Sequence, residues 1–444
     1  MTIKRDAYLN RLIDAKHDGF VKIVTGLRRC GKSYLLFNLF KRHLLDNGVA
    51  RDHIIEIDLE QKNMERYRAP TPLHDYIQSH LANDGKWNYI LIDEIQLCHK
   101  TLNPAIDLNR VHPDDRDDCY ETFYSVLSQL RSTANVDVYV TGSNSKMLAS
   151  DIATEFRGRG EVIPLFPLSM AEFLPLRKSA RDLYSVFYEY LDFGGLPECV
   201  TLKTPDRKVS YLTNLYKTIY IRDIAERNML KSDELLDAIT HVAMSNVGTL
   251  TNPAKLANAI QTVMGIKTNR VTVTKYLKFL TDAYVLQETT RFDIKGNHYL
   301  ETPLKYYAGD CGLRNAALNF RQNERSHLME NAIYNELKRR GYAIDVGVVD
   351  HKVIGADGKA TINHHEIDFV VNKASERIYI QSAFSIPDEE KRAQETFSLT
   401  HTRDHFRKIV VTGDPYEKPW MNKEGITFIG IMPFLLNPKS IEMF

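Results

Sequence analysis

The sequence has few cysteines, no long apolar segment and almost no net charge, and each absence excludes a class of protein. Its five cysteines are odd in number and match neither a zinc-site nor a disulfide spacing. No run of about 18 apolar residues occurs, which excludes a transmembrane helix, and the charged first residues exclude a signal peptide. We therefore expect a cytoplasmic protein in a reducing compartment, with no membrane partner.

The charge balance argues against one broad nucleic-acid-binding surface. Lys and Arg number 58 and Asp and Glu number 57, which gives a formal charge of +1. Any contact with nucleic acid must therefore come from a local basic patch. The hydrophobic fraction of 43% is ordinary for a globular protein, and 444 residues suggest about three domains.

The first 165 residues alternate short β-branched runs with amphipathic stretches. This order predicts an α/β fold, with a parallel sheet that carries helices on both faces. A helix is expected from Lys32 to about Leu45, and the polar insertion 99–118 is expected to be a surface loop. The expected strands are Phe20–Thr25, His53–Leu59, Tyr89–Asp93, Val136–Thr141 and Glu161–Leu165.

A glycine-bounded loop follows the first expected strand. The run from Gly26 to Ser33 fits the pattern G-x-x-x-x-G-K-[ST], in which backbone N–H groups surround the phosphates of a nucleotide. Lys32 would reach the β- and γ-phosphates, and the Ser33 hydroxyl would bind Mg²⁺. The alternative is a glycine turn with an incidental lysine. The residues expected at the nucleotide are Gly26, Arg29, Cys30, Gly31, Lys32, Ser33 and Tyr34.

Two consecutive acids end the third expected strand. Asp93 there would complete the Mg²⁺ site with Ser33, and Glu94 would activate the attacking water. The alternative is a surface acidic pair that caps the next helix.

Polar residues after the fourth expected strand complete the predicted catalytic set. Asn144 or Ser143 would orient the water, and the competing interpretation is a simple polar turn. Arg157 and Arg159 would stabilise charge on the phosphoryl group across a subunit boundary, unless they form a solvated basic turn.

The later part of the chain divides into three further predicted segments. Residues 166–231 are expected to form a helical lid or linker. Residues 232–320 hold three helical stretches and two extended runs around Lys295–Asn297, the order of a winged helix-turn-helix. Residues 321–444 begin with a helix and continue with strands, which predicts a small α/β domain.

Taken in series, these motifs resemble the prokaryotic AAA+ ATPases whose C-terminal half is a domain of unknown function. The resemblance covers nearly the whole chain. It implies ATP and Mg²⁺ as ligands, a homo-oligomer with an arginine acting in a neighbouring site, and a nuclease-like fold after the winged helix. The motifs are GLRRCGKS, LIDEIQ, VTGSNSKMLASDIATEFRGRG, PLSMAEF, FGGLPE, IYIRDIAER, KYYAGDCGLRNA and EIDFVV.

Two parts of the resemblance leave their roles open. Arg222 and Asp223 match the family's RD pair and have no assigned function, although they could pair with each other. In the winged-helix segment, basic and polar residues suit DNA contacts, whereas many such domains bind only protein. The candidate nucleic-acid contacts are Arg270, Thr272, Lys275, Lys278, Arg291 and Lys295.

The nuclease-like domain lacks two residues that an active enzyme of that fold carries. Glu330 and Asp368 are in place, but Gln381 stands where a second acid belongs and Ala383 where a lysine belongs. Glu330 and Asp368 alone would hold a metal weakly, and without the lysine nothing is left to stabilise the charge. We therefore expect an inactive nuclease fold. His364 and His365 alternate faces if extended, and we expect a solvated loop there.

Three hypotheses remain. The first is an ATP-hydrolysing machine that couples turnover to a partner, with DNA the favoured one. The second is a nucleotide-dependent switch or scaffold that binds protein through its C-terminal half. The third is an ATP-gated nuclease, against which Gln381 and Ala383 argue.

Overall fold

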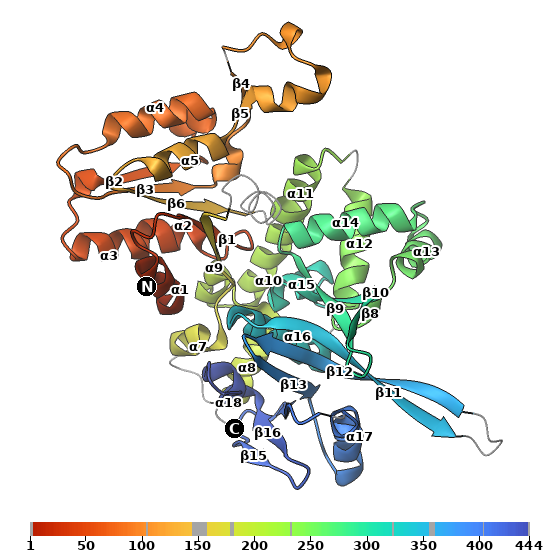
Figure 1. Cartoon of the computed structure of the whole chain (residues 1–444). Coiled ribbons are helices and arrows are strands. Elements are labelled where there is room, and N and C mark those ends of the chain that lie inside the picture. The colour runs from red at the N-terminus through yellow and green to blue at the C-terminus, as the bar shows by residue number, and fades with distance from the viewer. Residues whose placement is uncertain are drawn as a thin grey trace. The chain divides into compact units, whose positions relative to one another are not determined.

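The structure is a computed structural model that describes residues 3–103, 105–143, 158–177, 182–230, 233–321, 324–354, 360–402 and 404–442. The chain forms two compact units (Figure 1). The first contains Met1–Leu165 together with Asp282–Tyr284, and the second contains Phe166–Thr281 and Val285–Phe444. Among the described residues, none of the helices combines the length and the apolar character that crossing a bilayer requires.

The first unit is built around a five-stranded parallel sheet in the order β2-β3-β6-β1-β7. This confirms the predicted α/β class. Its strands are β1 (Val21–Thr25), β2 (Ile54–Asp58), β3 (Asn88–Asp93), β6 (Val136–Gly142) and β7 (Gly160–Pro164). Its helices are α1 (Asp6–Asp14), α2 (Lys32–Tyr34), α3 (Lys41–Asp46), α4 (Pro70–His80) and α5 (Phe123–Ser132).

Helices cover both faces of this sheet, which explains why most of its strand residues are apolar and buried (Figure 1). On one face, Leu73 and Ile77 of α4 and Leu127 of α5 pack on strand residues such as Ile23 and Ile92. A π-helical turn (Leu35–Phe40) joins α2 to α3, and Phe40 packs against Tyr139 on the other face. Each fully buried side chain of this size stabilises the fold by about 1.5–3 kcal/mol.

One ion pair lies inside the sheet. The Lys22 side chain is fully buried, and its Nζ lies 2.6 Å from Asp137 Oδ1 and 2.6 Å from Asp18 Oδ1. Asp137 Oδ2 also accepts hydrogen bonds from the Tyr139 hydroxyl and the His17 N–H. A buried charge is tolerated only when partners replace the lost water, so these contacts hold β1 and β6 together.

The insertion after β3 is more structured than expected. It is not a simple surface loop, because β4 (Thr101–Leu102) pairs with β5 (Tyr120–Glu121) and two 3₁₀ turns lie between them. Pairing of its two ends satisfies backbone groups that a free loop would leave to water.

The second unit contains a mixed sheet in the order β15-β16-β14-β13-β12-β11-β9-β10-β8. The strands are β8 (Leu250–Thr251), β9 (Leu286–Asp293), β10 (His298–Ala308), β11 (Ala343–Ile354), β12 (Ala360–Lys373), β13 (Glu376–Ala383), β14 (Arg407–Thr412), β15 (Trp420–Met421) and β16 (Ile426–Gly430). The expected hairpin of the winged-helix segment is β9–β10, and β9 pairs in parallel with β11 of the C-terminal segment. One sheet therefore spans the proposed boundary at residue 320.

Helices surround this sheet, and those of the proposed lid belong to the same unit. Tyr334 of α16 stacks on Tyr307 of β10, and Leu399 of α17 packs against Val410 and Phe428. The helices are α7 (Met170–Phe173), α8 (Leu183–Phe193), α9 (Pro197–Thr201), α10 (Pro205–Asn214), α11 (Arg222–Arg227), α12 (Glu234–Ser245), α13 (Pro253–Met264), α14 (Arg270–Asp282), α15 (Cys311–Ala317), α16 (Arg325–Arg339), α17 (Glu389–Thr400) and α18 (Ile431–Leu436).

The expectation for the two adjacent histidines is wrong. His364 and His365 lie within β12 rather than in a loop, because β12 continues its ladder with β11 as far as Ala360. His364 Nδ1 lies 2.6 Å from Asp350 Oδ1 across that ladder, and the His365 ring packs on Phe397 with ring centroids 4.4 Å apart.

The buried ion pair gives a test of the first unit. Replacing Asp137 with Ala leaves the buried Lys22 short of a partner, and we expect the free energy of unfolding to fall by about 3–5 kcal/mol. The measurement is urea unfolding in a Trp420→Phe background, where Trp87 is the remaining tryptophan and reports on the first unit.

The matched control for this prediction is Asp46→Ala. Asp46 pairs with Arg42 on the surface, with both side chains more than two-thirds exposed, so the expected loss is below about 0.5 kcal/mol. Equal losses in the two variants would contradict a stabilising role for the buried pair.

Candidate nucleotide site

The glycine-bounded loop connects β1 to α2 at the carboxyl edge of the parallel sheet, where ligands of such sheets bind. Gly26 has φ +145°, and a Cβ there would lie 2.1 Å from the carbonyl oxygen of Leu165. Gly31 has φ +100° and is the residue before α2. Both positions therefore require glycine, the first because of close backbone approach and both because of their left-handed conformation.

Lys32 is buried, and its side chain folds back over the loop. Its Nζ donates to the carbonyl oxygens of Gly26 and Leu27, at 3.3 and 3.4 Å. The same atom lies 3.7 Å from Glu94 Oε1. The ammonium group is therefore held at the centre of the loop by weak, long contacts, and phosphate oxygens would be stronger acceptors.

A threonine on β6 fixes the two acids that end β3. The Thr141 hydroxyl accepts a hydrogen bond from the Glu94 N–H at 3.0 Å and donates to Asp93 Oδ1 at 2.5 Å. Glu94 adopts a left-handed backbone with φ +53°, a conformation that costs a non-glycine residue about 1–3 kcal/mol. This left-handed residue turns the chain so that both carboxylates remain at the carboxyl edge of the sheet.

The surroundings of the two carboxylates differ. Burial raises the pKa of Asp93 to about 6, although hydrogen bonds from Thr141 and Ser33 oppose the shift. Glu94 Oε2 accepts from Ser143 Oγ at 3.1 Å and from the Gln96 side-chain amide. Asp93 therefore faces Ser33 of the loop, and Glu94 faces Lys32 and the end of β6.

The other residues predicted at this site fall into two groups. Asn144 and Arg157 lie outside the described residues, whereas Arg159 is exposed just before β7. Cys30 is buried with its Sγ 3.4 Å from the carbonyl oxygen of Leu165, so it packs the base of the loop. Arg29 lies within the loop, exposed and with φ +66°, and Tyr34 is half-buried just after the loop.

This arrangement fits the nucleotide and Mg²⁺ that such a loop implies. Two left-handed glycines bend the loop, an ammonium group lies at its centre, and a hydroxyl of Ser33 bonds the carboxylate of Asp93. Hydroxyl and carboxylate oxygens are the ligands that Mg²⁺ prefers. Sequence reasoning missed Thr141 and Gln96, because their roles depend on the pairing of β3 with β6.

The candidate nucleic-acid residues separate into two places in the second unit. Arg270, Lys275 and Lys278 are exposed on α14, while Val273 and Leu277 are buried. Thr272 is half-buried, and its N–H donates to the side chain of Asn269, the residue before α14.

Arg291 and Lys295 do not lie on a free wing. Arg291 is half-buried in β9, between β10 and β11, and its Nε is buried. Lys295 Nζ donates to the carbonyl oxygen of Asp350 on β11. Pairing of β9 with β11 is what turns the expected wing into the interior of a sheet.

Two further family motifs pack against each other in the second unit. Asp310 accepts hydrogen bonds from the N–H groups of Gly195 and Leu313 at 2.8 and 3.0 Å. Burial raises the pKa of Asp310 to about 6, against the effect of these bonds. Asn315 donates to the carbonyl oxygens of Leu191 and Asp192. The motifs FGGLPE and KYYAGDCGLRNA thus meet at a buried joint between α8 and α15.

Arg222 and Asp223 each bond to a residue one helical turn further along the chain. Arg222 Nε donates to Glu226 Oε1 at 2.7 Å, and Asp223 Oδ2 accepts from Arg227 at 2.8 Å. Both bonds join residues four apart, because side chains at that spacing lie on the same helix face.

The carboxylates at which the resemblance places a nuclease-like centre converge on a lysine that the sequence interpretation missed. Lys305 of β10 lies among Glu330 of α16 and Glu366 and Asp368 of β12. Its signal in the sequence is a charged residue between the apolar Leu304 and Tyr306.

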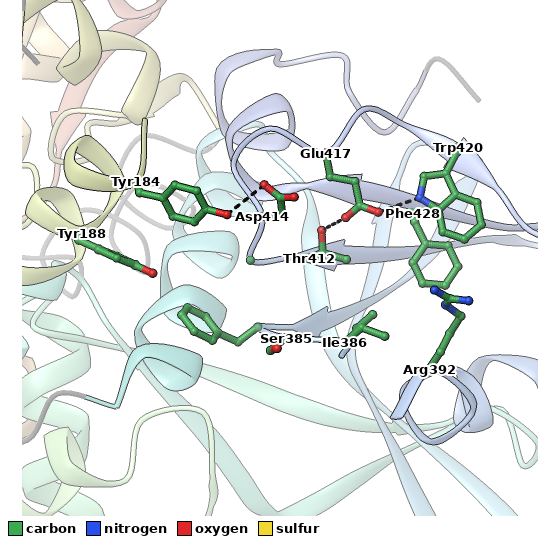
Figure 2. A pocket seen from close by; sticks show the side chains of 12 residues that line it. Tyr184, Tyr188, Ser385, Ile386, Arg392, Thr412, Asp414, Glu417, Trp420 and Phe428 are labelled. Atoms are coloured by element: carbon green, nitrogen blue, oxygen red, sulfur yellow. Dashed lines mark hydrogen bonds between the residues drawn. The ribbon is translucent and has the colours of Figure 1, made fainter. Parts of the chain in front are cut away.

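A cavity of about 470 Å³ lies at the carboxyl ends of β13 and β14 (Figure 2). Aromatic rings dominate its wall, and its acids already have partners: Asp414 accepts from the Tyr184 hydroxyl, and Glu417 from Thr412 and the Trp420 indole. The Arg392 guanidinium lies 5.6 Å from the Trp420 ring centroid. These contacts engage both acids within the protein, and they indicate no particular ligand for the cavity.

Comparisons with known families match two consecutive segments of the chain. A family model described as an AAA domain matches residues 18–174, and a domain of unknown function, DUF8612, matches residues 185–324. An uncharacterized protein of Haemophilus influenzae is 32% identical over 437 residues, which are 98% of each chain. An uncharacterized protein of Methanocaldococcus jannaschii is 25% identical, over 76% of this chain and 71% of its own.

Solved structures similar to this chain include ATPases at low identity. A Walker-type ATPase of Pyrococcus abyssi has 15% identity and a TM-score of 0.49, covering 71% of this chain and 96% of its own. The Orc1 protein of Aeropyrum pernix, solved in complex with DNA, has 12% identity and a TM-score of 0.27, covering 71% and 92%. Family membership rests on the family models and the Haemophilus relative. The chain therefore belongs to a prokaryotic family of AAA-type P-loop ATPases whose C-terminal half contains a domain of unknown function.

Proposed function

We propose that the first unit hydrolyses ATP with Mg²⁺ and that the second unit couples this turnover to DNA. The observation that carries the proposal is the position of Glu94. Its buried carboxylate lies 3.7 Å from the Lys32 ammonium. Glu94 also follows Asp93 directly in the chain. A nucleotide-binding loop alone needs no second acid there, whereas hydrolysis needs a base to accept a proton from water.

The remaining groups divide the work of binding. Lys32 and the N–H groups of the loop hold the phosphates, and Ser33 and Asp93 supply oxygen ligands to the metal. When bound, Mg²⁺ neutralises charge on the phosphates. Asp93 would favour the ionised form there, because a nearby cation opposes the effect of burial on its pKa.

The two hydrogen bonds of Lys32 to the loop must be replaced when the nucleotide binds. Phosphate oxygens compete with the carbonyl groups of Gly26 and Leu27 for Lys32. Ser143 and Gln96 hold Glu94 by the oxygen that does not face Lys32. These contacts keep the carboxylate oriented while water enters, and Ser143 or Asn144 would then orient that water.

We further propose that the chain acts as a homo-oligomer. Arg159 is exposed immediately before β7, so it is accessible to a neighbouring subunit. With Arg157 it would place a guanidinium on the phosphate of that neighbour's nucleotide.

DNA is the proposed partner because of the exposed face of α14. Arg270, Lys275 and Lys278 project from a helix whose other face is buried, which is the form of a recognition helix in the major groove. Lys295 and Arg291 contribute less, because backbone contacts and the sheet hold them.

The alternative is a nucleotide-dependent switch that binds protein. The two are distinguished by the rate of ATP hydrolysis with and without duplex DNA. Stimulation supports the machine. A lack of stimulation, together with a nucleotide-dependent change in particle size, favours the switch.

The role of Glu94 can be tested by substitution. We expect Glu94→Gln to retain ATP binding and to lower turnover by at least about 100-fold, because the amide cannot accept the proton of the water. Steady-state phosphate release and fluorescent-nucleotide titration measure the two effects. Glu65→Gln, an exposed substitution in the same unit, is the control. Unchanged turnover in Glu94→Gln would remove Glu94 from this role.

The role of α14 can be tested through the salt dependence of DNA binding. Replacing Arg270, Lys275 and Lys278 with Ala should weaken duplex binding and reduce the slope of log affinity against log salt by about 3. Fluorescence anisotropy at several salt concentrations measures it. The control removes three exposed charges elsewhere, at Lys418, Lys423 and Lys439. If both triple variants bind like the parent, α14 is not the DNA contact.

A further inference from the structure

The carboxylate cluster of the second unit contains a buried lysine at its centre. The Lys305 side chain is 3% exposed, although it carries a charge. Its Nζ lies 2.5 Å from Glu366 Oε1, 3.2 Å from Glu330 Oε1 and 3.8 Å from Asp368 Oδ1. Three carboxylates from one helix and one strand therefore meet at a single ammonium group supplied by a different strand.

The groups around the cluster set the pKa values of its charged side chains. Tyr307 donates to Glu330 Oε1 at 2.7 Å, and the Ser382 N–H donates to Asp368 Oδ2 at 2.9 Å. Burial alone would lower the pKa of Lys305, but the three acids outweigh it and raise that pKa. Burial and the neighbouring Glu330 raise the pKa of Asp368 well above its usual range. The cluster thus depends on a permanent positive charge between its acids.

The same residues do not fit the divalent metal that a nuclease fold implies. A metal bound by these carboxylates would lie within a few ångströms of the ammonium group, and like charges in a buried site repel strongly. Gln381 Oε1 already accepts a hydrogen bond from the Asp368 N–H. Among the residues that the structure describes, no group of three His, Cys, Asp or Glu side chains is arranged to hold a metal ion.

We propose that Lys305 takes the place of the metal ion in this domain. An ammonium group offsets part of the negative charge of the carboxylates, but it cannot generate a hydroxide as a bound metal does. The centre is therefore a metal-independent structural junction between β10, β12 and α16, and the domain does not cleave DNA at this point. The proposal predicts that removing the lysine leaves converging carboxylates that bind a divalent cation.

The experiment uses the full chain with Trp87→Phe, so that Trp420 is the remaining tryptophan and reports on the second unit. Lys305→Met, Asp368→Asn and the two combined are compared with this parent. Electron paramagnetic resonance of free Mn²⁺, without nucleotide, measures binding. Urea unfolding in Mn²⁺ and in EDTA measures stability. Lys423→Met, an exposed lysine in the same unit, is the control.

We expect the parent and Lys423→Met to show no Mn²⁺ binding that depends on Asp368, and equal urea midpoints in Mn²⁺ and EDTA. Lys305→Met should have a lower midpoint in EDTA, which Mn²⁺ raises. It should bind Mn²⁺ at least tenfold more tightly than the variant that also carries Asp368→Asn.

Two results would overturn the proposal. One is Mn²⁺ binding, or nicking of plasmid DNA, by the parent that Asp368→Asn abolishes. The other is a folded Lys305→Met that binds no Mn²⁺ through Asp368. If Lys305→Met does not fold, the comparison of the parent with Asp368→Asn decides, because absence of Asp368-dependent binding supports the proposal. None of these measurements involves ATP hydrolysis, so they are independent of the function proposed for the first unit.

Discussion

The candidate nucleotide site depends on one hydroxyl group. Thr141 accepts the N–H of Glu94 and donates to the carboxylate of Asp93, so a single side chain on β6 positions both acids of β3. Because β6 lies between β1 and β3, the loop and the acids are two strands apart, about 10 Å. The side chains of Lys32 and Glu94 meet across that distance, with 3.7 Å between Nζ and Oε1. The roles proposed for Lys32, Asp93 and Glu94 all require this separation to be fixed.

The parts of this site that could be predicted are those whose signal is local in the sequence. Gly26, Gly31 and Lys32 lie within eight residues, and the requirement for a left-handed turn before a helix selects their types. The five strands of the first sheet were predictable because helices cover both faces and most strand residues are apolar. Asp93 and Glu94 were recognisable because they end such a strand.

The parts that escaped prediction depend on contacts between distant residues. Thr141 is an ordinary strand residue until β6 pairs with β3. Lys305 is 25 residues from Glu330 and more than 60 from Asp368, and no spacing rule joins them. Arg291 seemed to belong to an exposed wing, because the sequence does not reveal that β9 pairs with β11. The stability of a buried charge likewise depends on partners that come together only in the folded chain.

The second unit therefore differs from a string of independent domains. The motifs around Gly195 and Asp310 meet in a buried joint, and Lys305 extends from the same strand that forms the hairpin of the winged-helix segment. The family motifs connect residues 166–231 to 232–320, and the buried charges and backbone pairing connect residues 232–320 to 321–444. The helices of residues 166–231 belong to this unit as well.

The continuous nine-stranded sheet has a consequence for how this family can evolve. Cutting the chain between the hairpin and the C-terminal strands would expose the edges of β9 and β11, and unpaired strand edges promote aggregation. Recombination at that boundary would give insoluble fragments instead of interchangeable modules. The hairpin and the C-terminal strands thus form one piece that cannot be divided at that boundary.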